Sequence, residues 1–155
     1  MSQENLLTLV QNANQLLVQV IERTLEEREL LKKRSLEGFT DCVDQKNELL
    51  QQLQANVTLR AEKLQQSGLG MDRKGHLSAT PEDQIEAMTA ALVEMDTLLK
   101  DFKQANDINS MIVGRSLTIA RQTLDLAKGQ QKNQQLYNNS GKAAHHAANQ
   151  VIGKA

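Results

Sequence analysis

The chain has 155 residues and a formal net charge of −1 at pH 7, and aromatic residues make up only 2% of it. Without an excess of basic residues, no bulk electrostatic attraction to nucleic acid or to anionic lipid is expected. A core that lacks aromatic residues must consist of Leu, Ile, Val, Met and Ala, which suits packed helices better than a sheet. The length and composition therefore predict one all-α domain.

The lone Cys42 cannot form an internal disulfide, which is typical of a protein in a reducing compartment. We interpret it as a small buried or half-buried apolar residue. The first residues, MSQENLLTLV, contain neither a basic n-region nor an unbroken apolar run, so no signal peptide is expected. No segment approaches the ~20 consecutive apolar residues of a membrane span. These features predict a cytoplasmic protein that is not inserted in a membrane.

Two heptad patterns follow one another in the first half of the chain. The first predicts a helix over about residues 3–33, whose apolar character fades near its end across the letters EERE. The second predicts a helix over about residues 36–66, with Ser35 as its N-cap. A basic cluster, a cap and a glycine between the two patterns favour a hairpin. One unbroken helix over residues 3–66 is the alternative.

The second heptad pattern places two charged residues, Lys46 and Arg60, at positions that otherwise hold apolar residues. A charge at such a position costs stability but fixes the register of helix packing, and a long stem can extend outwards to solvent. We therefore expect structural roles for both residues. If the chain reverses near residues 33–37, Glu27 comes opposite Lys46, and the two can form an ion pair near the turn.

A third helix is predicted over about residues 81–128. Residues 67–79 precede it with three glycines and no apolar period, so they are expected to form a loop that lets the third helix return along the hairpin. Thr80 can cap this helix and Pro81 suits its first position, whereas Gly129 predicts its end. The predicted fold is an antiparallel bundle or coiled coil of three long helices with a polar C-terminal tail.

Two asparagines, Asn106 and Asn109, lie on the apolar line of the third predicted helix. Amides at such positions set register or cap helices more often than they bind ligands, so we expect structural roles for them. The helix either continues through them or breaks there, in which case residues 110–128 would fold back as a fourth helix. Both possibilities remain open at the level of sequence.

The last part of the third helix has a much wider apolar face than the first part. At about 100° per residue, the apolar residues cover roughly half of the helix circumference. The residues of this face are Ile112, Val113, Leu117, Ile119, Ala120, Leu124, Leu126 and Ala127. A face of this width predicts a binding surface, although bundle core and a homodimer interface are also compatible with it.

The tail over residues 129–155 consists mainly of Gln, Asn, Lys and Ala. It holds few large apolar residues, so it cannot bury enough surface to offset the entropy of ordering. We expect a single helical-bundle domain over residues 1–128 and a tail that is flexible or marginally helical. Tyr137 is the only tyrosine in the chain, and a turn-like Asn-Asn-Ser-Gly follows it.

The sequence contains no convincing catalytic, metal or cofactor site. His145 and His146 are neighbours, which point about 100° apart on a helix and do not chelate one ion together. His76 lies in a glycine-flanked stretch without nearby ligand-type residues, and Cys42 has no histidine partner placed in the sequence. The sequence Gly-Leu-Gly at 68–70 lacks the ending of a phosphate-binding loop. We therefore expect no enzymatic activity and no cofactor.

Several stretches are distributed over most of the chain in a characteristic order. They are ERTLEERELLKKRSLEGF, DQKNELLQQLQ with Lys46, the Arg60…Leu64…Gly68 ending of the second helix, NDINSMIVGR with Asn106 and Asn109, and the late LYNNSGK. In this order of polar residues the chain resembles the FlgN family of flagellar export chaperones. The Ala-His-rich end AAHHAANQVIGKA departs from the family pattern, and we assign no role to it.

The resemblance implies a small, all-helical cytoplasmic chaperone of flagellar type III secretion. Such a protein binds the terminal segments of the hook–filament junction proteins FlgK and FlgL, prevents premature assembly and delivers them to the export apparatus. By this resemblance the substrate-protein site is C-terminal, which matches Ile112, Val113, Leu117, Ile119, Leu124 and Leu126. Tyr137 occupies the position that the family associates with docking on the export gate.

Two other functions compete with this interpretation. A structural coiled-coil adaptor would bridge two partners without protecting a client, and a phosphotransfer or metal-dependent enzyme would use the histidines. A homo-oligomer is compatible with the apolar face of the third helix. Neither the preferred junction protein nor the oligomeric state follows from the sequence.

Overall fold

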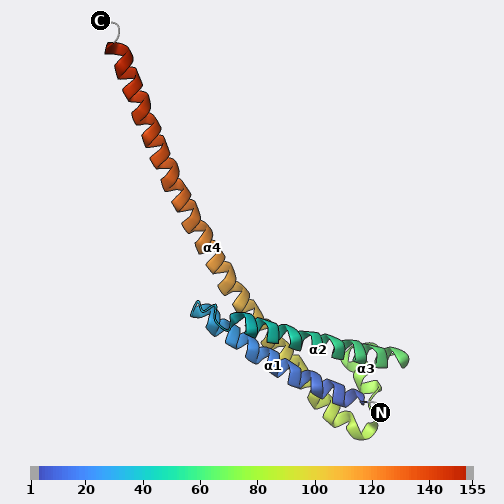
Figure 1. The fold of residues 1–155 in the computed structure, drawn as a ribbon. Helices are drawn as coiled ribbons and strands as arrows, with labels where there is room; N and C mark the ends of the chain where they lie inside the picture. The colour runs from blue at the N-terminus through green and yellow to red at the C-terminus, as the bar shows by residue number, and fades with distance from the viewer. Residues whose placement is uncertain (1–3, 153–155) are drawn as a thin grey trace. The chain divides into compact units, whose positions relative to one another are not determined.

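The computed structural model describes the backbone of residues 4–152 and the side chains of residues 4–129. This part of the chain is all-helical, as predicted, and contains four α-helices and one short 3-10 helix instead of three long helices (Figure 1). The elements are α1 (Leu6–Lys32), α2 (Phe39–Gln66), α3 (Arg73–Ser78), η1 (Glu82–Gln84) and α4 (Ile85–Ile152). The chain divides into two compact units, residues 1–112 and residues 113–155.

Helices α1 and α2 form a hairpin, which confirms that prediction and excludes one unbroken helix over residues 3–66. The predicted N-cap of the second helix is wrong. Ser35 donates its hydroxyl to the carbonyl oxygen of Glu37 at 3.2 Å, and Gly38 takes the N-cap position with a φ of 76°. A left-handed φ suits glycine because it has no Cβ. The chain therefore needs three more residues than predicted to reverse, and α2 begins at Phe39.

The core of residues 1–112 lies between α1 and the first part of α4, and the residues of α2 and α3 pack around it. Its buried residues are Val10, Ala13, Leu17, Met88, Ala91 and Met95, with Leu53 of α2 and Leu77 of α3 packed against them. These are aliphatic residues, Ala and Met, as the composition predicts. The first heptad pattern is confirmed, because its members on α1 from Val10 to Glu27 are buried: Val10, Ala13, Leu17, Val20, Thr24 and Glu27. On the third predicted helix, apolar residues recur at steps of three and four: Ile85, Met88, Leu92, Met95, Leu99 and Phe102. On α4, Met88 and Met95 of this line are buried but Leu99 is 46% exposed, so the line is only partly confirmed.

Three buried asparagines connect the helices of this unit. Each donates its side-chain Nδ2 to a main-chain carbonyl oxygen of another helix: Asn56 to Leu9 (2.8 Å), Asn14 to Ala91 (2.9 Å) and Asn109 to Thr24 (2.8 Å). A side-chain amide reaches such a carbonyl only at one axial position of the two helices. These contacts therefore fix the register of α1 against α2 and against α4, which a seam of Leu and Met alone specifies less sharply.

The predicted loop over residues 67–79 contains a short helix, α3. Asp72 caps it, because its side chain accepts a hydrogen bond from the main-chain N–H of Gly75 at 2.8 Å. Gly75 lies so close to the carbonyl of Gly70 that a Cβ at this position would collide with it. Thr80 does not cap the third long helix as predicted. Its hydroxyl bonds the carbonyl oxygen of His76 at 2.5 Å, and η1 precedes the start of α4.

Helix α4 runs without interruption from Ile85 to Ile152. The continuous alternative is thus confirmed, and the break that would fold residues 110–128 back is wrong. The predicted end at Gly129 is also wrong, because α4 passes through this residue. One glycine in a helix interior costs about 1 kcal/mol relative to alanine, which is not enough to end a helix. The proposed domain division after residue 128 remains a prediction.

Candidate functional site

The predicted substrate-binding residues lie on α4, and most of them are exposed. Val113 is 40% exposed, Leu117 and Leu124 are 54% exposed, Ile119 is 56% exposed and Leu126 is 71% exposed. These five belong to the second unit, whereas Ile112 is half-buried and ends the first unit. Monomeric soluble proteins seldom leave several large apolar side chains exposed on one stretch unless the surface binds something. We call the exposed surface over residues 113–127 the apolar face.

The apolar face has two ridges. At 3.6 residues per turn, Val113, Leu117 and Leu124 lie within about 40° of one another, and so do Ile119 and Leu126 on the second ridge. Small side chains separate the ridges: Ser116, Ala120, Thr123 and Ala127. The hydroxyl of Thr123 donates within the helix, to the carbonyl oxygen of Ile119 at 2.9 Å. The strip between the ridges, which we call the furrow, therefore holds only small side chains, so a second helix can approach it closely.

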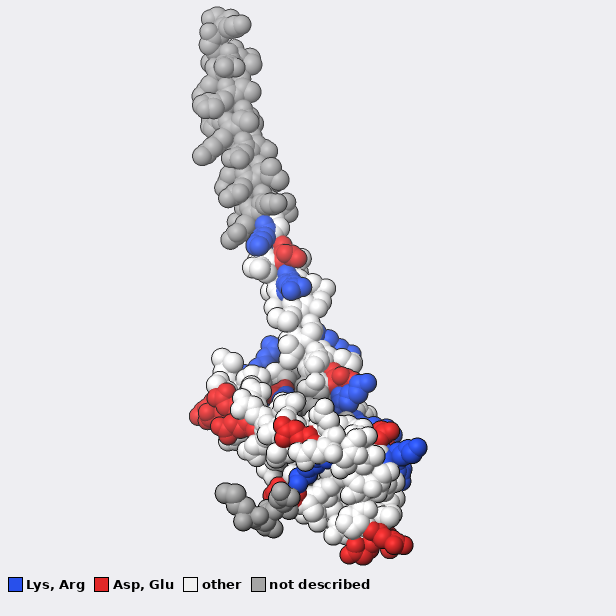
Figure 2. Space-filling model, turned by 90° about the vertical axis from the view of Figure 1, so that its right-hand side faces the viewer, with Lys and Arg blue, Asp and Glu red and all other residues white. Residues whose placement is uncertain are grey.

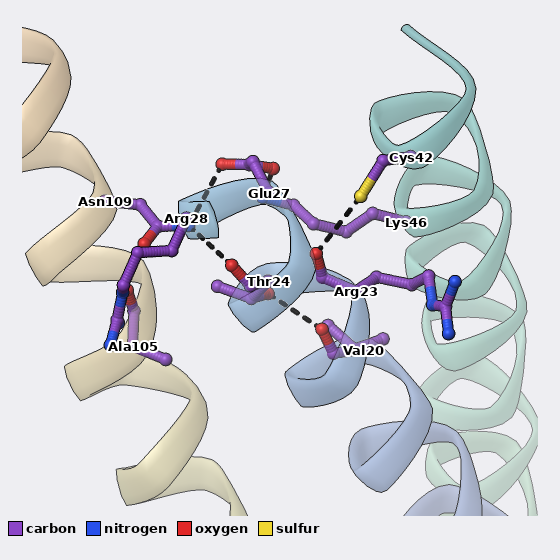
Figure 3. A network of polar contacts seen from close by, with 9 residues as sticks. All are labelled: Val20, Arg23, Thr24, Glu27, Arg28, Cys42, Lys46, Ala105 and Asn109. Carbon is purple, nitrogen blue, oxygen red and sulfur yellow. Dashed lines mark hydrogen bonds and ion pairs between the residues drawn. The ribbon is translucent and has the colours of Figure 1, made fainter. Parts of the chain in front are cut away.

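In residues 1–112, the ion pair predicted between Glu27 and Lys46 is confirmed. Lys46 Nζ lies 2.8 Å from Glu27 Oε2, and the side chains are 12% and 11% exposed, respectively. Asn109 donates from Nδ2 to the other carboxylate oxygen, Oε1, at 3.2 Å. Glu27 of α1 therefore contacts a residue of α2 and a residue of α4 (Figure 3).

Arg28 completes this polar cluster on the α4 side. Its Nε donates to Asn109 Oδ1 at 2.9 Å, and a terminal nitrogen donates to the carbonyl oxygen of Ala105 at 3.0 Å (Figure 3). Asn109, which is 2% exposed, thus uses its amide oxygen and its amide nitrogen in contacts with α1. We call Thr24, Glu27, Arg28, Lys46 and Asn109 the polar clamp. Asn106 is half-buried and takes no part in the hydrogen bonds of the clamp.

Arg60 does not extend to solvent, contrary to the expectation for long side chains on the seam. It is 5% exposed and donates from Nε to Asn56 Oδ1 at 2.9 Å. One terminal nitrogen lies 3.3 Å from His76 Nε2 and 3.8 Å from Met95 Sδ. Burial lowers the pKa of Arg60 from its ordinary value. None of the ion pairs in the described part of the chain involves Arg60, so amide, imidazole and thioether groups surround the guanidinium.

The histidine next to Arg60, His76, was not predicted from the sequence to have a structural role. His76 is 2% exposed on α3, and its Nδ1 lies 2.8 Å from the carbonyl oxygen of Asp72. A proton on Nδ1 leaves Nε2 free to accept from Arg60. The arrangement is that of a satisfied buried histidine. The tail residues Tyr137, His145 and His146 have side chains outside the described residues.

Cys42 is buried, as expected, and its Sγ lies 3.2 Å from the carbonyl oxygen of Arg23 (Figure 3). Burial, together with Glu26 and Glu27, raises the pKa of this thiol. A protonated, buried thiol is a poor nucleophile. Within the residues that the structure describes, no group of three or more His, Cys, Asp or Glu is placed to hold a metal ion. No described helix combines the length and the apolar character that crossing a membrane would require.

Two shallow grooves lie between α1 and α2. Their volumes are about 370 and 400 Å³, and they share Gln19 and Gln52. Most of the lining side chains are amides and charged groups, and the apolar ones include Leu16, Leu49 and Leu59. The first groove is mainly polar and the second mixes apolar with polar side chains, so neither presents a run of large exposed apolar side chains like that of α4. The apolar face is therefore the better candidate for binding another protein.

Comparison with known proteins identifies the family. The family model described as FlgN protein matches residues 1–145. The chain is also similar to the crystal structure of a flagella synthesis protein FlgN from Pseudomonas aeruginosa, with 30% sequence identity and a TM-score of 0.63. This similarity covers 73% of the present chain and 89% of that chain. A search of curated proteins finds no match. Because the family model matches most of its residues, the chain belongs to the FlgN family, a non-enzymatic family of flagellar proteins.

Proposed function

We propose that this chain is a cytoplasmic flagellar export chaperone whose clients are the hook–filament junction proteins FlgK and FlgL. The chaperone binds the terminal segment of a client, prevents premature assembly and delivers the client to the flagellar type III export apparatus. The observation that carries the proposal is the apolar face of α4, with its five large side chains 40–71% exposed, in a member of the FlgN family. Neither a cofactor nor a catalytic step is required.

The apolar face suits this task for a physical reason. A terminal segment that later forms a helix in an assembly has its own apolar stripe, and this stripe aggregates or assembles early when it is left in water. A second apolar helix can cover the stripe by packing along it. Complete burial of a Leu or Ile gains about 1.5–3 kcal/mol, so side chains that are already about half-buried gain about 1 kcal/mol each. The resulting affinity is moderate once the cost of association is included, which permits release.

Delivery to the export apparatus is assigned to Tyr137. The basis is its position in the family pattern, since its side chain lies outside the described residues. We expect Tyr137→Ala to retain client binding and to reduce export and swimming motility. Wild-type motility of the Tyr137→Ala strain would remove this role.

The binding proposal is tested by capture of a purified C-terminal segment of a junction protein on the immobilised chain. Ile119→Asp and Leu124→Asp place a carboxylate on the two ridges and should abolish capture. Val93→Asp is the matched control, because Val93 is 50% exposed on the same helix but lies in the first unit. Undiminished capture by both ridge variants would refute the proposed site. Capture that fails to slow self-assembly of the client would instead favour the coiled-coil adaptor.

A further inference from the structure

The two edges of the apolar face carry the same charge. Residues 113–129 contain three basic residues and one acidic residue. At about 100° per residue, Arg115 lies about 20° beyond Leu126 at one edge. Lys128 lies about 20° beyond Leu117 at the opposite edge, and Arg121 lies next to Lys128. The apolar face therefore has a cationic border on both sides.

The single acidic residue of this stretch, Asp125, lies outside the apolar face but beside one of its borders, because it comes four residues after Arg121 and three before Lys128. Asp125 lies about 170° from the middle of the apolar face, close to the centre of the polar side. All three basic side chains are exposed, and no ion pair in the described part of the chain involves them. In Figure 2, basic and acidic side chains lie close to one another on the part of α4 that precedes the residues drawn in grey. The cations at both edges are therefore available to a partner that packs on the ridges.

We propose that the partner of the apolar face is an amphipathic helix whose own apolar stripe is bordered by carboxylates on both sides. This inference rests on the proposed function and specifies the chemistry by which a client is selected. Apolar side chains of the client fill the furrow, and its Asp or Glu side chains meet Arg115 on one side and Arg121 and Lys128 on the other. Charges at the border of an interface discriminate between partners and speed association more than they add affinity.

A second copy of this chain is a poor occupant of the same face. Two identical faces packed against each other, parallel or antiparallel, bring a cationic edge next to a cationic edge on both sides. Like charges placed opposite one another destabilise such a contact. The homodimer interface that the sequence leaves open is therefore disfavoured for this face by its own charges.

An anionic membrane surface is also a poorer fit. Helices that lie in a membrane interface carry a strongly charged polar face rich in Lys and Arg, with Trp, Phe or Leu on the apolar side. The polar side here holds Thr118, Gln122 and Asp125, and residues 113–129 contain no aromatic residue. Two ridges with a furrow between them match the side-chain rows of a helix better than a fluid lipid layer.

The test uses the full chain and two labelled synthetic peptides. Both peptides have the same leucines along one helical face; one has Glu at both borders and the other has Lys. Fluorescence anisotropy at 50 mM and 500 mM NaCl gives the affinities. We expect the Glu-bordered peptide to bind at least about tenfold more tightly at the lower salt concentration, and the preference to shrink at the higher one as the Debye length falls. Equal binding of the two peptides would overturn the inference.

Charge reversal provides the decisive variant. In the chain with R115E, R121E and K128E, the preference should invert in favour of the Lys-bordered peptide. Lys103→Glu is the control, because Lys103 is exposed on the same helix but lies in the first unit, and it should change neither affinity by more than about twofold. An unchanged preference in the triple variant would overturn the inference even if both peptides bind.

Failure of this inference and failure of the proposed function give different results. If the triple variant captures the junction-protein segment as the wild type does while Leu124→Asp does not, the client site stands and the charge selection is wrong. If Leu124→Asp binds both peptides normally, the site itself is wrong. Co-sedimentation with phosphatidylglycerol vesicles in preference to the Glu-bordered peptide would assign the face to a membrane. A wild-type dimer that Leu124→Asp dissociates would assign it to a second copy.

Discussion

Removal of the ammonium group of Lys46 is expected to destabilise the first unit substantially. In Lys46→Met the apolar stem remains, but the partner 2.8 Å from Glu27 Oε2 is lost while the carboxylate is still only 11% exposed. Breaking a buried ion pair by removing one partner costs about 3–5 kcal/mol, compared with about 0.2–1 kcal/mol for an exposed pair. Asn109 still donates to Glu27 Oε1 at 3.2 Å and offsets part of the loss. We therefore expect a destabilisation of about 2 kcal/mol.

The double variant Glu27→Gln/Lys46→Met separates the lost attraction from the remaining buried charge. It removes both charges, so the desolvation of an unpaired carboxylate disappears, while the Gln side chain can still accept from Asn109. We expect the double variant to be more stable than Lys46→Met by about 1 kcal/mol. Thermal denaturation followed by circular dichroism at 222 nm measures both. For a unit of this size, 2 kcal/mol corresponds to a fall in Tm of roughly 8–12 °C.

Lys100→Met is the matched control, because Lys100 pairs with Asp96 at 2.9 Å on the exposed surface of α4 and should leave the Tm unchanged. If Lys46→Met has the same Tm as this control, Glu27 is solvated and the polar clamp does not hold the helices together. A double variant less stable than the single variant would contradict the desolvation argument in particular.

Three further predictions concern the first unit. Arg60→Met should destabilise it by about 2 kcal/mol in urea denaturation, because Asn56 Oδ1 and His76 Nε2 lose their donor; unchanged stability would mean that water replaces the guanidinium. Gly75→Ala should cost about 1–3 kcal/mol in the same assay, because the added Cβ collides with the carbonyl of Gly70, and equal stability would mean that the turn before α3 adjusts freely. Burial first, and then the charges of Glu26 and Glu27, raise the pKa of Cys42 above its ordinary value of 9.0. The protonated thiol is therefore favoured in the folded state. Its contribution to the free energy of unfolding is complete below about pH 9 and is lost as the pH rises through the folded-state pKa. At pH 8 a disulfide reagent such as DTNB should therefore modify the native thiol only as fast as the chain unfolds, and immediate modification would place the thiol at the surface.

The sequence predicted the parts of the fold that repeat over many residues. The heptad line of α1 recurs over several turns, so its buried face was found from Val10 to Glu27. The ion pair of Glu27 with Lys46 was also predictable, because opposite charges on facing seams near the chain reversal are buried at low cost only when they pair. The continuous course of α4 was one of two open alternatives. Asn109 agrees with the continuous course, because its amide oxygen and its amide nitrogen both form hydrogen bonds with α1 while α4 continues past it.

Features that depend on a few atoms were not predictable in this way. Helix α3 has six residues, too few to show an apolar period. Its cap at Asp72 depends on the tight turn that brings Gly75 next to the carbonyl of Gly70, and the sequence does not reveal this turn. The second heptad pattern runs through Leu53, Val57 and Arg60 and so predicts that Val57 is buried. The buried residue is instead its neighbour Asn56, which donates to the carbonyl oxygen of Leu9. Choosing between neighbours requires the position of the facing carbonyl, which the sequence does not contain.

The proposed function assigns folding and client binding to different residues of α4. In the first unit its buried side chains, from Met88 to Asn109, contact α1 and contribute to folding. In residues 113–127 the large side chains are mostly exposed, so substitutions there remove little of the folding free energy. A helix without tertiary packing is only marginally stable in water. Under the proposed function, a client that packs on the apolar face would stabilise the helix as it covers the ridges, and part of its binding free energy would be used in this way. The proposed chaperone would thus bind and release a client while the contacts between α1 and α4 keep the first unit folded.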